Sequence, residues 1–232
     1  MALPVLETPT YELTLPSTQQ LVKYRPFLVK EHKILLSLEK TGAKNIVKTV
    51  KDLINVCTFE KLDVDSLPNF DMEYVFLNLR SKSIGEMVDV NITCVCDEKI
   101  KTYIDLNKIK IENQNKINSN IVDLGNNLKA KLRYPNFEEM MDIYENIDTE
   151  KVFEVIGKCV DEVYEGDKIH SEFTPEELNT FILSLTKKQF SSIEEFFVNL
   201  PKVTYDDEVK CKKTDCGNIN KIRLEGIEHF FI

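Results

Sequence analysis

The segment EMVDVNITCVCDEKIKTYIDL, residues 86–106, decides how this chain is interpreted. Two stretches of alternating apolar and polar residues stand in it on either side of a pair of cysteines. Apolar and polar residues alternate over residues 88–92, and the alternation resumes after the cysteines. A period of two is typical of a β-strand, so the segment predicts a β-hairpin with Cys94 and Cys96 at its tip.

A second segment, near the end of the chain, has the same design. DEVKCKKTDCGNINKIRL, residues 207–224, also reads as strand, cysteine, short turn, cysteine and strand. Two such tips brought together would place four thiolates at the corners of a tetrahedron, which is the arrangement of a zinc ribbon. One interpretation is therefore a structural zinc ion that joins the two hairpins and adds folding free energy there. The candidate ligands are Cys94, Cys96, Cys211 and Cys216.

The spacing of these cysteines leaves a second interpretation open. Zinc ribbons usually offer C-x2-C at each tip, whereas this chain has C-x-C and C-x4-C. The four residues are therefore either metal ligands or free thiols. The N-terminal segment MALPVLETPTYELTL has no basic start followed by an apolar block, so we expect neither export nor an oxidising environment. Cys57 and Cys159 lie in helical apolar patterns and are expected to be small core residues.

The rest of the chain alternates between strand and helix patterns. Residues 11–27 predict a hairpin, and residues 128–135 predict a further strand. Helical spacing is found from Lys30 to Gly42, with Ile34, Leu35 and Leu38 on one face. Four more segments have helical spacing: residues 46–57, a segment that starts at Pro68, a segment that starts at Thr174, and residues 191–200. We therefore expect an α+β fold in which β-hairpins pack with several helices, with a zinc-ribbon-like pairing of the cysteine hairpins.

The domain organisation has two possible forms. Residues 1–232 form either one mixed domain or two closely packed lobes, with about residues 1–85 in the first and 86–232 in the second. The chain shows no Gly/Ser-rich linker and no tandem repeat that would choose between them.

Composition excludes several classes of protein. The 42% hydrophobic content of the 232 residues suffices for a buried core, and the net charge of −9 argues against nucleic acid as the principal partner. The longest apolar runs, at 34–38 and 196–200, are far shorter than the roughly 20 residues of a transmembrane helix, so we expect no membrane span. Acidic residues are dense over 137–177, which predicts a solvated helix face or, less simply, a site for a metal or a basic partner.

Motifs of the common enzyme classes are missing from the sequence. The seven glycines are too scattered for GxGxxG or GxxxxGK[ST], and neither HExxH nor GxSxG occurs. Each of the three histidines, His32, His170 and His229, stands alone in its neighbourhood. We therefore expect a protein that is not an enzyme. A cysteine-dependent enzyme stays open as an alternative, because cysteine and histidine partners meet only in space.

Several long phrases resemble one family. YELTLPSTQQLVKYRPFLVKEHKILL, LTKKQFSSIEEFFVNLPKV and CKKTDCGNINKIRLEGIEHFF are similar to the baseplate hub assembly and hub subunit proteins of T-even-type contractile-tailed bacteriophages, in the same order over nearly the whole chain. The family shares an RPFLVKE-type phrase, here Arg25–Glu31, and an ending that here runs from Leu224 to Phe231. Its members commonly have C-x2-C pairs at the positions of the two cysteine pairs.

The resemblance implies a late structural protein without catalytic residues. It would assemble, or reside in, the central hub of the tail baseplate by binding other hub proteins and the tape-measure protein. It would be made in the host cytoplasm and could stay in the virion tail. A zinc-ribbon adaptor for another protein target is the alternative. We expect RPFLVKE to be the packed junction of hairpin and helix, and the apolar ending GIEHFFI to dock on its own core.

Overall fold

The structure is a computed structural model that describes residues 6–37, 43–117, 119–145 and 149–226. Its fold is mixed α+β, as predicted. Some predicted features lie outside the described residues, namely Leu38, Gly42 and residues 227–232 of the GIEHFFI ending. The expectations for them stay predictions. No helix in the described part of the chain combines the length and the apolar character needed to cross a membrane.

The chain divides into two compact units, which are described separately. The first unit comprises Met1–Asp65, Phe70–Glu112 and Lys202–Ile232, and the second comprises Ser66–Asn69 and Asn113–Pro201. The predicted division into one domain or into lobes on either side of residue 85 stays a prediction.

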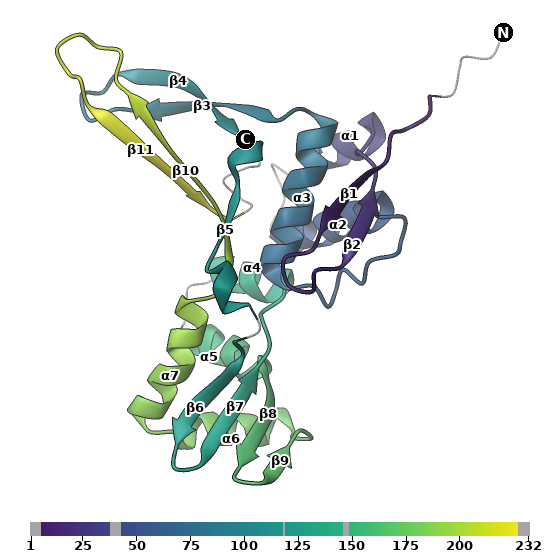
Figure 1. The fold of residues 1–232 in the computed structure, drawn as a ribbon, viewed down its shortest axis with the longest axis vertical. Helices are drawn as coiled ribbons and strands as arrows, with labels where there is room; N and C mark the ends of the chain where they lie inside the picture. The colour runs from purple at the N-terminus through teal and green to yellow at the C-terminus, as the bar shows by residue number, and fades with distance from the viewer. Residues whose placement is uncertain (1–5, 38–42, 118, 146–148, 227–232) are drawn as a thin grey trace. The chain divides into compact units, whose positions relative to one another are not determined.

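The first unit begins with a hairpin and three helices (Figure 1). These are β1 (Tyr11–Thr14), β2 (Leu21–Tyr24), α1 (Val29–Ser37), α2 (Ala43–Cys57) and α3 (Asn69–Ser83). Helix α3, in the segment where helical spacing was predicted from Pro68, is buried on more than one side, and Phe76 and Leu79 are almost inaccessible. Asp71 in its first turn accepts hydrogen bonds from the backbone amide and the hydroxyl of Ser17, which fix the turn of the hairpin to the helix.

The shared face predicted for the apolar residues of the first helix is not its buried side. Ile34 is 53% exposed, and Glu31 is the buried residue of α1. The periodicity of α1 is weak because its apolar residues are adjacent rather than spaced by three or four, so it did not identify the inner face.

Two long antiparallel hairpins complete the first unit (Figure 1). They are β3 (Met87–Thr93) with β4 (Lys99–Asp105), and β10 (Lys202–Lys210) with β11 (Ile219–Glu225), to which β5 (Lys110–Glu112) adds an edge strand after the 3-10 turn η2 (Leu106–Lys108). The Asp105 amide donates to the Tyr205 hydroxyl at 3.4 Å, so the two hairpins meet at the ends of their strands remote from the cysteines. The predicted cysteine hairpins are therefore confirmed.

The second unit is a four-stranded antiparallel sheet with helices. In chain order its elements are η3 (Gln114–Lys116), β6 (Ile121–Gly125), β7 (Leu128–Leu132), α4 (Phe137–Glu145), α5 (Thr149–Lys158), β8 (Val160–Glu165), β9 (Lys168–His170), α6 (Pro175–Ser184) and α7 (Lys187–Val198). The strands are ordered β6-β7-β8-β9. Helix α6 begins after Thr174, as its spacing predicted, and Thr174 and Glu177 form a capping box there. Leu132 and Ile193 lie in the apolar core that the sheet shares with the helices.

The same polar arrangement occurs once in each unit, although the sequence predicts no repeat. We call Arg25, Glu31 and the Cys57 carbonyl the first Arg–Glu motif: the Arg25 side chain pairs with Glu31 at 3.1 Å, and the Arg25 amide donates to the Cys57 carbonyl at 2.9 Å. In the second Arg–Glu motif, Arg133 pairs with Glu139 at 2.6 Å and its amide donates to the Cys159 carbonyl at 2.7 Å.

Both motifs occupy the same place in a strand–helix–helix segment. The arginine directly follows β2 or β7, and the glutamate is the third residue of α1 or α4. The cysteine ends α2 or directly follows α5. Each motif therefore closes the end of a strand onto the start of one helix and the end of the next. For RPFLVKE this confirms the predicted junction of hairpin and helix.

Candidate metal centre

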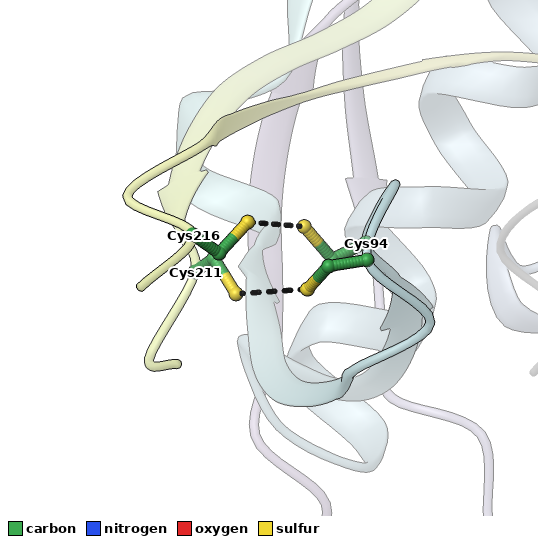
Figure 2. A group of neighbouring side chains, drawn as sticks. Cys94, Cys211 and Cys216 are labelled. Carbon is green, nitrogen blue, oxygen red and sulfur yellow. Dashed lines mark hydrogen bonds between the residues drawn. The ribbon is translucent and has the colours of Figure 1, made fainter. Parts of the chain in front are cut away.

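Four cysteine side chains from the two hairpin tips converge (Figure 2). The sulfur atoms of Cys94 and Cys216 are 3.8 Å apart, and those of Cys96 and Cys211 are 3.7 Å apart. All four sulfur atoms lie within 4.8 Å of one another. Each short distance joins a cysteine of one hairpin to a cysteine of the other, so the cluster spans the two tips.

The first tip is shaped by a tight turn. The Asp97 amide donates to the Cys94 carbonyl, and the Cys94 amide donates to the Glu98 carbonyl, both at 2.9 Å. Asp97 has a left-handed backbone conformation with φ of 64°, which aspartate tolerates better than most residues. The turn lets Cys94 and Cys96 both contact thiols of the second hairpin, while Val95 between them is 83% exposed.

The second tip needs a longer loop to bring its two thiols together. The Cys211 amide donates to the Asn218 carbonyl at 2.8 Å and closes the loop, and the Cys216 amide donates to the Lys213 carbonyl at 3.1 Å. Gly217 follows with φ of 59°, a conformation that favours glycine. The C-x4-C spacing therefore accommodates one extra turn and still returns Cys216 to the cluster.

Backbone amides near the sulfur atoms favour thiolates. The Cys96 amide is the main cause that lowers the pKa of the Cys94 thiol to about 6. The Lys213 amide lowers the pKa of the Cys211 thiol, but burial and the three neighbouring thiols raise it to about 12. The Cys216 pKa is also raised, because the Asn218 amide is outweighed by the Cys96 thiol and by burial. One thiolate thus forms readily, and further thiolates repel it unless a cation is present.

The geometry of the cluster fits a tetrahedral zinc ion. A Zn–S bond of about 2.3 Å requires sulfur atoms roughly 3.8 Å apart along the edges of the tetrahedron. The two shortest separations, 3.7 and 3.8 Å, match this edge. They also exceed the roughly 2.05 Å of a disulfide bond, and all four cysteines are free. With four protein ligands no coordination position would be left for substrate, so the arrangement suits a structural and not a catalytic ion.

Apolar side chains and one amide surround the cluster. Cys94 and Cys211 are buried, and Ile92, Ile100 and Val209 pack against the cysteines. The Asn218 side chain lies with its nitrogen 3.7 Å from the Cys94 sulfur. Sequence reasoning missed this residue, since an asparagine two positions after a cysteine carries no signal by itself.

The remaining candidates show no comparable arrangement in the described part of the chain. Among the described residues, the four cysteines are the one group of three or more histidine, cysteine or acidic side chains placed closely enough to hold a metal ion together. Cys57 and Cys159 are fully buried, which confirms them as core residues, and burial raises their thiol pKa values to about 11 and about 12. His170 lies 3.5 Å from Glu165 on an exposed surface.

Comparison with known proteins supplies the family. A model of the family described as "T4 bacteriophage base plate protein" matches residues 8–232. The chain belongs to this family. Searches of curated proteins and of solved structures found no match. Membership makes the chain a phage base plate structural protein, and other phage tail proteins are the implied partners. In this base plate protein the cysteine cluster therefore lies on a scaffold that belongs to a virion assembly.

Proposed function

We propose that this base plate protein helps to build, or forms part of, the central hub of the phage tail baseplate by binding other hub proteins. The observation that carries the proposal is the family match over residues 8–232. The phrases that resemble hub proteins support the narrower assignment to the hub. Assembly takes place in the host cytoplasm, the tape-measure protein is a further candidate partner, and the protein performs no catalysis.

The four cysteines hold a structural zinc ion in this proposal. The sulfur separations fit the tetrahedral edge, and the tips are remote in sequence, at residues 94–96 and 211–216. When bound, zinc would neutralise thiolates that otherwise repel one another and would tie the β3–β4 hairpin to the β10–β11 hairpin. The ion thereby holds the two hairpin tips together at a place where the hairpins bury few residues of their own.

Affinity purification from infected cells tests the hub assignment. A tagged protein is recovered after infection, and its partners are identified by mass spectrometry. We expect hub proteins among the partners. Recovery of host proteins alone would overturn the assignment and would favour a zinc-ribbon adaptor for a cellular target.

Elemental analysis and a double-mutant cycle test the zinc site. We expect roughly one zinc per chain. Cys94→Ser and Cys211→Ser should each lower the free energy of unfolding by about 3 kcal/mol or more, and the double variant should cost little more than either alone. Val95→Ser is the matched control, because Val95 lies at the same tip but is exposed. Fully additive losses, or a protein without metal, would rule out the shared site.

A further inference from the structure

Most of the net charge of the protein lies on the second unit. Its main segment, Asn113–Pro201, contains seventeen acidic and nine basic residues, a net charge of −8, whereas the whole chain carries −9. The first unit is therefore almost neutral. A surface of one sign selects partners of the opposite sign and raises their rate of association.

An apolar groove lies within this acidic unit, beside α6. Its volume is about 410 Å³, and it is lined on the apolar side by Val163, Phe173, Leu178 and Phe181. Val163 is buried, whereas the two phenylalanines and Leu178 are only partly covered and pack at the margin of the core. A solvated helix face has no need of aromatic side chains at its margin, so acidity alone does not explain this surface.

Carboxylates surround the groove. Glu165, Glu172 and Glu177 line it together with His170, and all four residues are exposed. Glu177 is occupied by the capping box of α6, because its carboxylate accepts from the Thr174 amide at 2.7 Å. Glu165 and Glu172 therefore remain as the two carboxylates that a ligand could engage without loss of the helix cap.

The groove also borders a sheet edge. His170 belongs to β9, whose three residues are all exposed and whose outer side pairs with no strand among the described residues. Partner segments commonly bind by lying along such an edge, with alternate side chains entering neighbouring pockets. Helix α6, beside the groove, is mostly uncovered. Ile182 is its one buried residue, whereas nine of the fifteen residues of α3 in the first unit are buried.

We infer that this groove binds an extended cationic segment of another tail protein. An apolar side chain of that segment enters between Phe173 and Phe181, and flanking lysine or arginine residues pair with Glu165 and Glu172. The inference rests on the proposed function, because it assigns a surface to the binding of tail proteins. A second copy of this chain is the competing occupant, since its second cysteine tip carries Lys210, Lys212 and Lys213.

A direct binding measurement tests the groove. The probe is a short fluorescein-labelled peptide in which lysine alternates with phenylalanine and leucine, and its control has glutamate in place of lysine. We expect the full-length protein to bind the lysine peptide, and Glu165→Lys with Glu172→Lys to weaken binding about tenfold. The matched control, Asp142→Lys with Glu195→Lys, changes the net charge of the same unit equally away from the groove and should weaken binding less than twofold.

The outcomes separate the groove from its alternatives. Equal losses in the two double variants would reduce the binding to general electrostatics and overturn the inference. Self-association of the protein at low salt that the Glu165/Glu172 variant abolishes would assign the groove to a second copy instead. NMR chemical-shift changes on peptide addition should centre on His170, Phe173 and Phe181, and shifts confined to other residues would contradict the site.

The same variants used in infected cells distinguish failure of the groove from failure of the proposed function. If the unmodified protein recovers tail proteins and the Glu165/Glu172 variant recovers them equally, the groove is wrong and the function stands. If the unmodified protein recovers no tail protein, the hub function fails whatever the peptide result. Loss of one tail protein in the groove variant, with retention in the control variant, is the expected result.

Discussion

The two Arg–Glu motifs join the same three elements, a strand end and two helix ends, but the second motif has more hydrogen bonds between its arginine and its glutamate than the first. In the second motif, both Arg133 guanidinium nitrogens bond Glu139, at 2.6 and 2.8 Å. In the first motif a single nitrogen of Arg25 bonds Glu31, and the other donates to the Pro26 carbonyl at 2.9 Å. Bidentate pairs are stronger and more directional than single contacts. The second motif is thus the better-formed ion pair.

The helix cap accounts for a further difference. Asn136 precedes α4, and its side chain accepts from the Glu139 amide at 3.0 Å while Glu139 accepts from the Asn136 amide at 2.9 Å, so the two form a capping box. The corresponding residue before α1 is Leu28, whose amide donates to Glu31 but whose side chain has no acceptor. Leu28 and Asn136 occupy the same backbone position, and the capping box is complete at α4 because Asn136 has a side-chain acceptor that Leu28 lacks.

The comparison shows which parts of the motif are required. Both units keep the arginine, the glutamate and the cysteine carbonyl, and they differ in the cap and in the number of contacts. The glutamates are held as carboxylates in both: burial raises the pKa of Glu31 and of Glu139, but the paired arginine and the cap amide lower each below its ordinary value. The shared groups therefore define the junction, and the others adjust its strength.

The largest expected effect comes from removal of the arginines. Arg133→Met leaves a largely buried carboxylate without its bidentate partner and should lower the free energy of unfolding by about 3 kcal/mol. Arg25→Met should cost less, about 2 kcal/mol, because Lys30 also lies 3.5 Å from Glu31. Denaturant unfolding gives the loss, and hydrogen exchange assigns it to α4 or to α1.

Two further variants check this ranking. Arg133→Lys keeps the charge but not the fork of donors and should fall between the natural protein and Arg133→Met. Lys23→Met removes an exposed partner of Glu12 and should cost no more than about 0.5 kcal/mol. A larger loss for Arg25→Met than for Arg133→Met would contradict the view that the second motif is the stronger pair.

An exchange of the cap residues should have an intermediate effect. Asn136→Leu removes half of the capping box and should cost about 1 kcal/mol. Leu28→Asn supplies the missing acceptor to α1 and, since Leu28 is 40% exposed and loses little burial, should stabilise the protein by about 0.5 kcal/mol.

Thermal unfolding followed by circular dichroism measures both cap variants. Asn136→Asp retains an acceptor and is the control that should leave stability nearly unchanged. Destabilisation by Leu28→Asn would mean that the packing of Leu28 matters more than the empty cap position, and the two motifs would then not be comparable at this residue.

Much of the fold was predictable because its signals are local. Alternation identified the hairpin strands, and the helical spacing from Thr174 identified the start of α6. The gathering of Cys94, Cys96, Cys211 and Cys216 was also predictable, since both pairs stand between strand patterns. Their role as metal ligands stays a prediction.

The missed features depend on contacts between distant residues. The acidic stretch 137–177 was expected to be a helix face, yet it also contains β8 and β9. These strands are held by pairing in the sheet, β8 with β7 and β9 with β8. The Arg–Glu motifs escaped detection because only the arginine and the glutamate, six positions apart, recur at matching positions of the two segments. The cysteine carbonyl that completes each motif is a backbone group, which a sequence pattern does not reveal.

The smallest expected effect is the dependence of the two motifs on pH. The folded-state pKa values of Glu31 and Glu139 lie below the ordinary value, so the folded protein binds fewer protons there than the unfolded chain. Stability from each glutamate is therefore fully present above about pH 5 and is lost as the pH falls through the ordinary glutamate pKa of about 4.3 and below it.

Glutamine variants isolate this contribution from the cysteine site, which also protonates in acid. Glu31→Gln and Glu139→Gln should each flatten the fall in unfolding free energy between about pH 5.5 and 3.5, by roughly 0.5 kcal/mol. Because the cysteines are unchanged, their own response to acid cancels in the comparison. The flattening should be the greater for Glu139→Gln, whose carboxylate has two guanidinium contacts and a capping box to lose. Equal flattening would show that the bidentate contact adds nothing to the charge pair, and the two motifs would then differ in geometry alone.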